Sequence, residues 1–239
     1  MPEQYSWRSR LSEGFTIVLS ILAAFALDSW WHNYTVARDV GSGIRAVAEE
    51  LVEVERHLEL RIAAYDQSIE YLSQALGLIE SVDQGQIVQV PDKLMAGALY
   101  TPTIDPPTGA INAFLDSGLL SGVANRDLRH RIGELPSRFE DGADDEMSAL
   151  SYVDNNVRPT LERSLSSTDF SAVLKQMPHY WALFRDSTPW AEPSISVSVA
   201  ATPELHNAIA SRLQMMKFAR VEVEDFRRVV VSTVAMTGY

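Results

Sequence analysis

Apolar residues form one uncharged block near the start of the chain and recur at helical spacing through most of the remainder. The block runs from Gly14 to Leu27 and is flanked by Glu13 and Asp28. Its 14 residues would span about 21 Å as a helix, which is short of the roughly 30 Å hydrocarbon layer of a bilayer. The wider segment from Leu11 through Trp31 has 21 residues and is long enough.

Two tryptophans support a membrane role for this segment. Trp30 and Trp31 stand at its end, where aromatic side chains gather at a membrane interface. The sequence therefore predicts a short tail over residues 1–12, a transmembrane anchor over 13–31 and a body over 32–239. With 46% hydrophobic residues, the body is large enough to bury a core of its own.

A cleaved signal peptide is the alternative interpretation. Arg8 and Arg10 precede the apolar block, and Ala24-Phe25-Ala26 has the small-x-small pattern of a cleavage site. The mature protein would then be a periplasmic helical domain that binds a small ligand near a group of aromatic residues. These are Tyr180, Trp181, Phe184 and Trp190.

Polar and small residues share one arc of the anchor helix. At 100° per residue the arc carries Glu13, Thr16, Ser20, Ala24 and Asp28. We name these five residues the anchor seam; Val18, Leu22 and Phe25 face elsewhere. Small residues let helices approach closely in lipid, and intramembrane carboxylates face a partner or water. The seam predicts lateral association with a second copy or another membrane subunit, unless both acids simply lie among the lipid headgroups.

The clearest helical period of the body follows Gly41-Ser42-Gly43, which is a candidate flexible joint. Apolar residues then step by three or four: Ile44, Val47, Leu51, Val54, Leu58, Ile62, Tyr65, Ile69, Leu72, Leu76 and Ile79. This spacing predicts a long amphipathic helix that ends near Gly85 and packs in a helical bundle, with a coiled-coil dimer as the alternative. If the glycines are helical, the anchor continues into this helix as a stalk.

Capping residues and prolines divide the remaining chain into further helices. We expect helices to begin at Pro91-Asp92, Thr108, Asn125 and Thr202-Pro203, and Gly118 and Pro136 to end two of them. A helix with Phe139 and Leu161 on its apolar face should kink or end near Pro159, and a short helix should include Phe170, Val173 and Leu174. Ile195, Val197 and Val199 alternate with serines but have no evident partner strand, which favours extended chain. The predicted fold class is all-α.

Charge and composition exclude several classes of function. The net charge is −12, from 32 acidic and 20 basic residues, so the body is unsuited to nucleic acid or an anionic lipid surface. Cysteine is absent, which excludes disulfides and thiolate chemistry. Glu53 and His57 share a helical face, yet no metal-ligand motif accompanies them. The acidic run Glu140, Asp141, Asp144, Asp145 and Glu146 fits a solvated helix face. We predict no catalytic residue, metal or cofactor.

Three segments resemble an uncharacterised bacterial family of single-pass membrane proteins, catalogued as a domain of unknown function. They are the anchor from Glu13 to Trp31, the motif Ala113–Leu119 with Asn125–Arg129 and Ile132, and the helix start Pro203–Asn207. At the end of the anchor, the family's Asn-Trp-Asn is replaced by Asp-Ser-Trp-Trp. The resemblance implies a membrane-anchored helical protein and no activity.

These observations together predict a bacterial inner-membrane protein with one transmembrane helix. Arg8 and Arg10 on one side of the anchor are balanced by Arg38 and Arg45 on the other, so positive charge marks the orientation weakly. A short tail is easier to retain than a large acidic body, which favours a cytoplasmic N-terminus and a periplasmic body. We expect a non-enzymatic scaffold or accessory subunit that binds other proteins or itself.

Overall fold

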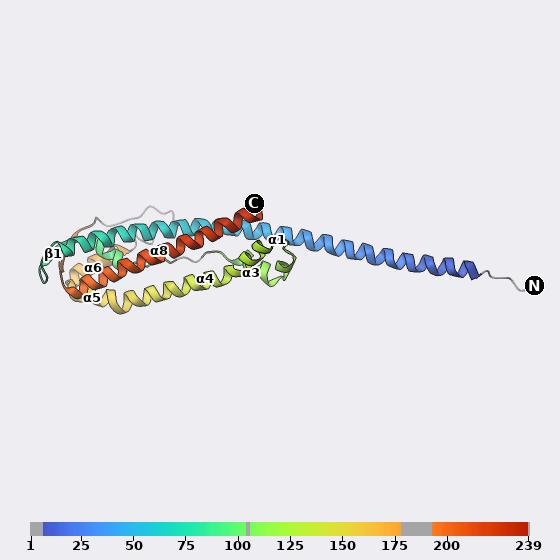
Figure 1. Cartoon of the computed structure of the whole chain (residues 1–239). Coiled ribbons are helices and arrows are strands. Elements are labelled where there is room, and N and C mark those ends of the chain that lie inside the picture. Colours follow the sequence, from blue (N-terminus) through green and yellow to red (C-terminus); the bar gives the residue numbers. More distant parts are fainter. Residues whose placement is uncertain (1–6, 104–105, 178–192, 239) are drawn as a thin grey trace, which may run out of the picture.

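One helix runs through the anchor and the body without a break. The structure is a computed structural model; it describes residues 7–103, 106–177 and 193–238, with side chains from Gly14 onward. Helix α1 spans Trp7–Glu80, 74 residues, and its first third projects from the body as a free rod (Figure 1). The predicted stalk is confirmed, and so is the all-α fold class.

The body is a bundle built on α1. Its other elements are β1 (Ile87–Pro91), α2 (Asp92–Leu99), α3 (Gly109–Asp116), the 3-10 turn η1 (Leu119–Gly122), α4 (Arg126–Tyr152), the π-helical turn η2 (Val153–Val157), α5 (Arg158–Ser164), α6 (Ser167–Lys175), β2 (Ser196–Ala200) and α8 (Pro203–Thr237). Helix α8 returns antiparallel to α1 and α4 lies along the other side of the bundle, while α3 and η1 form the end near the rod (Figure 1). We call this end the base of the body.

The apolar period of α1 is buried inside its own chain. Val47, Leu51 and Val54 are completely buried, as are Leu205, Ile209 and Val230 of α8. Helix α8 and the shorter helices cover this apolar face of α1, so the predicted helical bundle is confirmed. The face is therefore not free to form a coiled coil with another copy.

The proposed joint at Gly41-Ser42-Gly43 is wrong, because α1 is helical through it. A Cβ atom on Gly43 would lie 2.6 Å from Cε2 of Phe114, and closer still to Cδ2, so the glycine makes room for a buried aromatic ring of α3. Gly41 has nothing within 4 Å of such an atom. Gly43 is therefore a packing notch and not a flexible position.

The caps predicted from sequence are confirmed at several helix ends. The Asn125 side chain accepts hydrogen bonds from the backbone amides of Asp127 and Leu128, and Thr202 caps α8 in the same way through Leu205. Gly118 adopts a left-handed backbone conformation, with φ of 73°, directly after α3 and Ser117. Side-chain oxygens satisfy amides that the first turn of a helix leaves unpaired.

One expectation about proline is confirmed, while another and the one about strands are wrong. Pro136 lies inside α4 and does not end it, because the next apolar residues keep the helix in the bundle. The predicted interruption near Pro159 is confirmed, because α4 gives way to the π-helical turn η2 and Pro159 stands in the first turn of α5. The stretch 196–200 is strand β2, which pairs antiparallel with β1, Val88 opposite Val199 and Val90 opposite Val197.

A buried carboxylate joins this small sheet to two helices. Asp92, at the start of α2, is 2% exposed and accepts hydrogen bonds from Gln176 Nε2 at 3.1 Å, from Ser194 Oγ at 2.6 Å and from the Ile195 amide at 3.2 Å. The contacts link α2, the residue after α6 and the chain entering β2. Such a group is tolerated inside a protein because its oxygens are satisfied.

Candidate functional site

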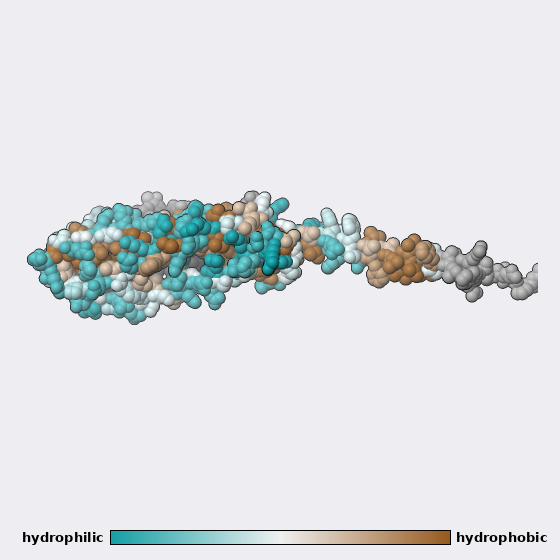
Figure 2. Space-filling model, viewed as in Figure 1, coloured by the Kyte–Doolittle hydropathy of each residue, from teal (hydrophilic) through white to brown (hydrophobic). Residues whose placement is uncertain are grey.

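The anchor segment carries a continuous apolar surface that the body leaves uncovered (Figure 2). An 18-residue window at the start of α1 has a mean hydropathy of 1.5, and none of it is buried. Figure 2 shows the hydrophobic band on the rod, separated from the mixed surface of the body by a polar stretch. Within the described residues, α1 is the one helix long and apolar enough to cross a membrane. A surface of this size marks an interface with lipid or protein.

The seam residues that the structure describes are all exposed on this rod. Thr16, Ser20, Ala24 and Asp28 lie on the uncovered part of the helix, and the Ser20 hydroxyl donates to the Thr16 carbonyl at 2.8 Å. This bond satisfies a polar group within the helix itself, which suits an apolar environment. The Glu13 side chain lies outside the described residues.

Aromatic rings form a cluster at the end of the apolar band. The ring centroids of Trp30 and Trp31 are 6.3 Å apart, and Tyr34 stacks on Trp30 at 5.9 Å. All three side chains are more than half exposed. Rings of this kind favour the level of lipid headgroups, so the cluster marks where a bilayer surface would cross α1.

The body contains a cleft between α1, α4 and α8. It has a volume of about 470 Å³ and apolar walls that include Leu58, Phe139, Val223 and Phe226. The rings of Phe139 and Phe226 meet edge to face at 5.2 Å. A volume of this order fits a small organic ligand.

A buried ion pair lies in this cleft. Arg61 Nη1 is 2.7 Å from Glu146 Oε1, and the two side chains are 9% and 13% exposed. Arg61 also donates to the Tyr65 hydroxyl at 3.2 Å. The acidic run of α4 is therefore not a uniform solvated face, because Glu146 turns inward as the partner of an α1 arginine.

Two carboxyl groups meet at the rim of the cleft. The pKa of Glu222 of α8 is raised by desolvation and by the nearby carboxylate of Asp145 of α4. No ion pair joins either carboxyl to a base within the described part of the chain. Glu222 accordingly keeps its proton to a higher pH than an ordinary glutamate.

A second arginine is buried close by without a carboxylate. Arg212 of α8 is 1% exposed and donates to the Tyr100 carbonyl and to Thr101 Oγ1, both at 2.8 Å. Burial lowers the pKa of Arg212 to about 10, which leaves it charged at neutral pH. The contacts hold the chain after α2 against α8, which is a structural role.

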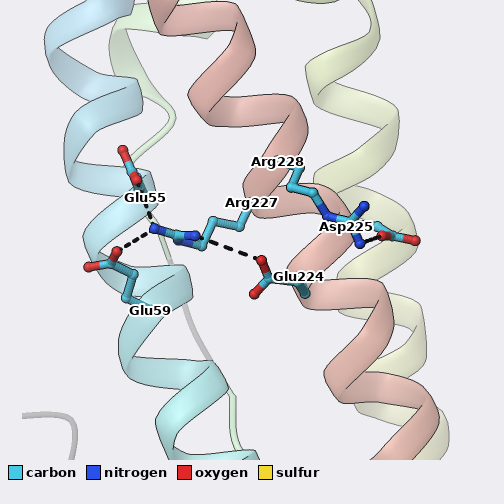
Figure 3. Close-up of polar contacts among 6 residues, drawn as sticks. All are labelled: Glu55, Glu59, Glu224, Asp225, Arg227 and Arg228. Atoms are coloured by element: carbon cyan, nitrogen blue, oxygen red, sulfur yellow. Dashed lines mark hydrogen bonds and ion pairs between the residues drawn. The ribbon is translucent and has the colours of Figure 1, made fainter.

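Ion pairs fasten α8 to α1 nearer the base (Figure 3). Arg227 Nη2 lies 2.6 Å from Glu59 Oε1 and 3.2 Å from Glu55 Oε1, and its Nη1 lies 3.8 Å from Glu224. The acids of the long helix thus bind a partner helix of the same chain. The neighbouring Arg228 pairs with Asp225 on the outer side of α8.

The carboxylates that lie near His57 on α1 make other contacts. His57 Nε2 is 3.1 Å from Glu53 Oε1, and Arg56 holds the pKa of Glu53 down at about 2. Glu50 turns away and accepts the Ala110 and Ile111 amides at 2.9 and 2.8 Å, at the start of α3. Among the described residues no group of three potential ligands is close enough to hold a metal ion.

The aromatic residues proposed to line a ligand site, Tyr180, Trp181, Phe184 and Trp190, lie outside the described residues. The 470 Å³ cleft lies elsewhere, and sequence reasoning missed it because its residues come from three separate helices. The sequence offered one sign of the cleft, which is that apolar residues of α4 at helical spacing lie close to its acidic residues.

Comparison with known proteins returns no match: no family model, curated protein or solved structure is similar to the chain.

Proposed function

We propose that the protein is a single-pass membrane protein that acts by lateral association within the bilayer, as a scaffold or accessory subunit without catalytic activity. The observation that carries this proposal is the helix α1, whose apolar first third is wholly uncovered while its remainder is the central helix of the body. A segment of this kind is stable only when lipid or another protein covers it.

The anchor seam is the surface that makes the contact. Thr16, Ser20 and Ala24 present small side chains on one arc, and such residues allow backbones to approach closely in lipid, where packing drives association. Asp28 lies on the same arc close to the tryptophans, where a carboxylate meets water or a partner. The partner in this proposal is a second copy or another membrane subunit.

The location that fits this function is a bacterial inner membrane, with the N-terminus in the cytoplasm and the body in the periplasm. Helix α1 continues through Ala24-Phe25-Ala26 into the core of the body, as a retained anchor would. Intact-mass analysis of protein from carbonate-washed membranes tests this. A mature chain that starts at Leu27 in the soluble fraction would overturn it.

Single-cysteine crosslinking tests the seam directly, because the chain has no cysteine of its own. Cysteines placed one at a time at Thr16, Ser20 and Ala24 should form disulfide-linked dimers in oxidised membranes. Matched cysteines at Val18, Leu22 and Phe25 are also exposed but lie on the opposite arc, and should form several-fold fewer disulfide-linked dimers. Equal crosslinking at all six positions would contradict the seam.

Substitution of the seam separates self-association from binding to another subunit. Ser20→Leu with Ala24→Leu should weaken oligomers, or the retention of a co-purifying subunit, in mild detergent. Leu22→Ala on the opposite arc is the control and should have no effect. Unchanged assembly of the seam variant would count against the proposal.

The cleft supports a second candidate function, the binding of a small organic ligand. Its volume of about 470 Å³, its aromatic wall and the Arg61–Glu146 pair are the observations in favour. Screening the full chain in detergent by thermal shift, with Phe139→Leu as the comparison, tests it. This candidate would be rejected if no ligand raised the melting temperature, or if every ligand raised it equally in the unmodified protein and in Phe139→Leu.

A further inference from the structure

The base of the body carries a different balance of charge from the rest of the molecule. Residues 32–45 and 109–131 hold five arginines against three aspartates, in a chain with 32 acidic and 20 basic residues overall. The arginines are Arg38, Arg45, Arg126, Arg129 and Arg131. The net charge of −12 therefore does not describe the surface nearest the anchor.

Packing fixes the height of this surface along α1. A Cβ atom on Gly122 of η1 would lie 3.8 Å from Val36 Cγ1 and 2.8 Å from Val40 Cγ2, so η1 lies directly on the stalk at this level. Val36 and Val40 are five and nine residues beyond Trp31, about 7.5 and 13.5 Å along a helix. The polar interface of a bilayer is about 5–7 Å thick on each side. The base therefore lies within about one Debye length of the headgroup layer when Trp31 is at the interface.

Arg45, Arg126 and Arg129 have neither an ion pair nor a side-chain hydrogen bond to another described residue. Arg38 pairs with its neighbour Asp39, and Arg131 donates to Ser232 of α8 at 2.7 Å. We name Arg126 and Arg129 the basic rim. Arg45 does not belong to it, because it is 14 residues beyond Trp31, about 21 Å along the helix and well past the headgroup layer.

The start of α4 concentrates this charge. Arg126, Asp127, Arg129 and His130 surround one shallow hollow in the surface, and α4 begins beside α3 at the end where the rod emerges (Figure 1). The Asn125 side chain already satisfies the amides of Asp127 and Leu128. The groups that remain available to a ligand are therefore the guanidinium groups and not the end of the helix.

We propose that the basic rim binds the headgroups of anionic phospholipids and so holds the base of the body on the membrane surface. Arginine forms paired hydrogen bonds with phosphate oxygens, and basic residues next to a membrane helix are attracted by anionic lipid within about one Debye length. A lipid surface is the partner that α1 itself brings to this height. The inference rests on the proposed membrane anchor and adds to it a contact with one class of lipid.

The test uses the full chain in nanodiscs. A fluorophore on Ser121→Cys, an exposed residue of η1, reports its depth through quenching by headgroup-labelled lipid. We expect at least twofold stronger quenching in discs with 30% phosphatidylglycerol than in pure phosphatidylcholine, and loss of that difference in about 0.5 M salt, where charges are screened. Arg126→Gln with Arg129→Gln should give equal quenching in the two lipids. Circular dichroism confirms that each variant is folded.

A matched double variant controls for the loss of two charges. Lys175→Gln with Lys217→Gln removes two exposed positive charges far from the base of the body. This variant should keep the full difference in quenching between the two lipid compositions. If the anchored wild-type chain is quenched equally in both lipids, or if the rim variant keeps the difference, the lipid contact is overturned while the anchor stands. If the chain is washed from membranes by carbonate, the proposed function fails and this inference fails with it.

Discussion

Two arginines of the body, Arg61 and Arg212, are buried and have different hydrogen-bond partners. Arg61 meets a carboxylate of α4, whereas Arg212 has only a carbonyl and a hydroxyl oxygen. An ion pair buried in this way contributes little compared with apolar packing, but removing one partner leaves an uncompensated charge. Arg61 and Glu146 are accordingly expected to decide whether α4 stays closed on α1.

The Arg61–Glu146 pair gives the clearest stability prediction. We expect Glu146→Gln to lower the free energy of unfolding by about 3 kcal/mol, because it leaves the Arg61 charge buried and unpaired. Asp144→Asn, two residues earlier on the exposed face of α4, should change it by less than about 0.5 kcal/mol. Urea unfolding of the full chain in detergent, followed by circular dichroism, measures both. Equal effects would contradict the buried role of Glu146.

The contact of His206 with Glu80 predicts a small pH dependence. His206 Nε2 lies 2.9 Å from Glu80 Oε1, and this hydrogen bond raises the pKa of His206. Because the folded chain binds this proton more tightly, the contact stabilises the fold below about pH 6 and ceases to do so as pH rises through the raised pKa.

Both side chains are substantially exposed, so screening limits the effect to about 0.5 kcal/mol. We expect Glu80→Gln to lower the melting temperature by about 1–2 °C at pH 5.5 and to leave it unchanged at pH 8.5. Differential scanning fluorimetry at the two pH values measures this. An equal change in melting temperature at both pH values would show that the charge of His206 is not the cause.

At the scale of elements, two glycines of α1 with similar sequence surroundings have opposite roles. Gly43→Ala forces a methyl group into the Phe114 ring, and overpacking of this kind costs about 1–3 kcal/mol. Gly41→Ala meets open space and should stabilise the helix by up to about 1 kcal/mol. Thermal unfolding of the two variants should therefore shift in opposite directions. Stabilisation by both would mean that Gly43 is not a notch.

Helices were predictable from the sequence where the signal is local. The three- and four-residue period of α1 and the caps at Asn125 and Thr202 depend on neighbours within a few positions. The pairing of β1 with β2 joins residues more than 100 positions apart, and β1 itself is only five residues long. Nothing local marks Val88 as the partner of Val199, so the strand period at 195–199 lacked a visible partner.

Pro136 also shows that local sequence signals are insufficient where tertiary packing decides the structure. A proline costs a helix one hydrogen bond and often ends it. Here Leu128, Ile132 and Leu135 anchor the turns before it, and Phe139 packs against Phe226 just after it. Tertiary packing therefore carries α4 through a residue that would end an isolated helix. The cleft beside it was invisible to sequence reasoning for the same reason.

At the scale of the whole molecule, the continuous α1 transmits the position of the anchor to the body. The exposed stalk between Trp31 and Val36 is helical, so an insertion there that stays helical should move the body as a rigid unit. Four alanines after Asn33 add about 6 Å of rise and about 40° of rotation. Four residues of Gly-Ser-Gly-Ser at the same place break the helix instead.

Distances between spin labels at Leu27→Cys and Val52→Cys test this, since both positions are exposed and the chain has no other cysteine. The 25 intervening steps predict a narrow distribution near 37 Å in spin-diluted nanodiscs. The alanine insertion should lengthen it by about 6 Å without broadening, while the glycine-serine insertion should broaden it severalfold. A broad distribution in the unmodified chain would show a hinged anchor. The base could then no longer be held at the height that brings the basic rim to the headgroups.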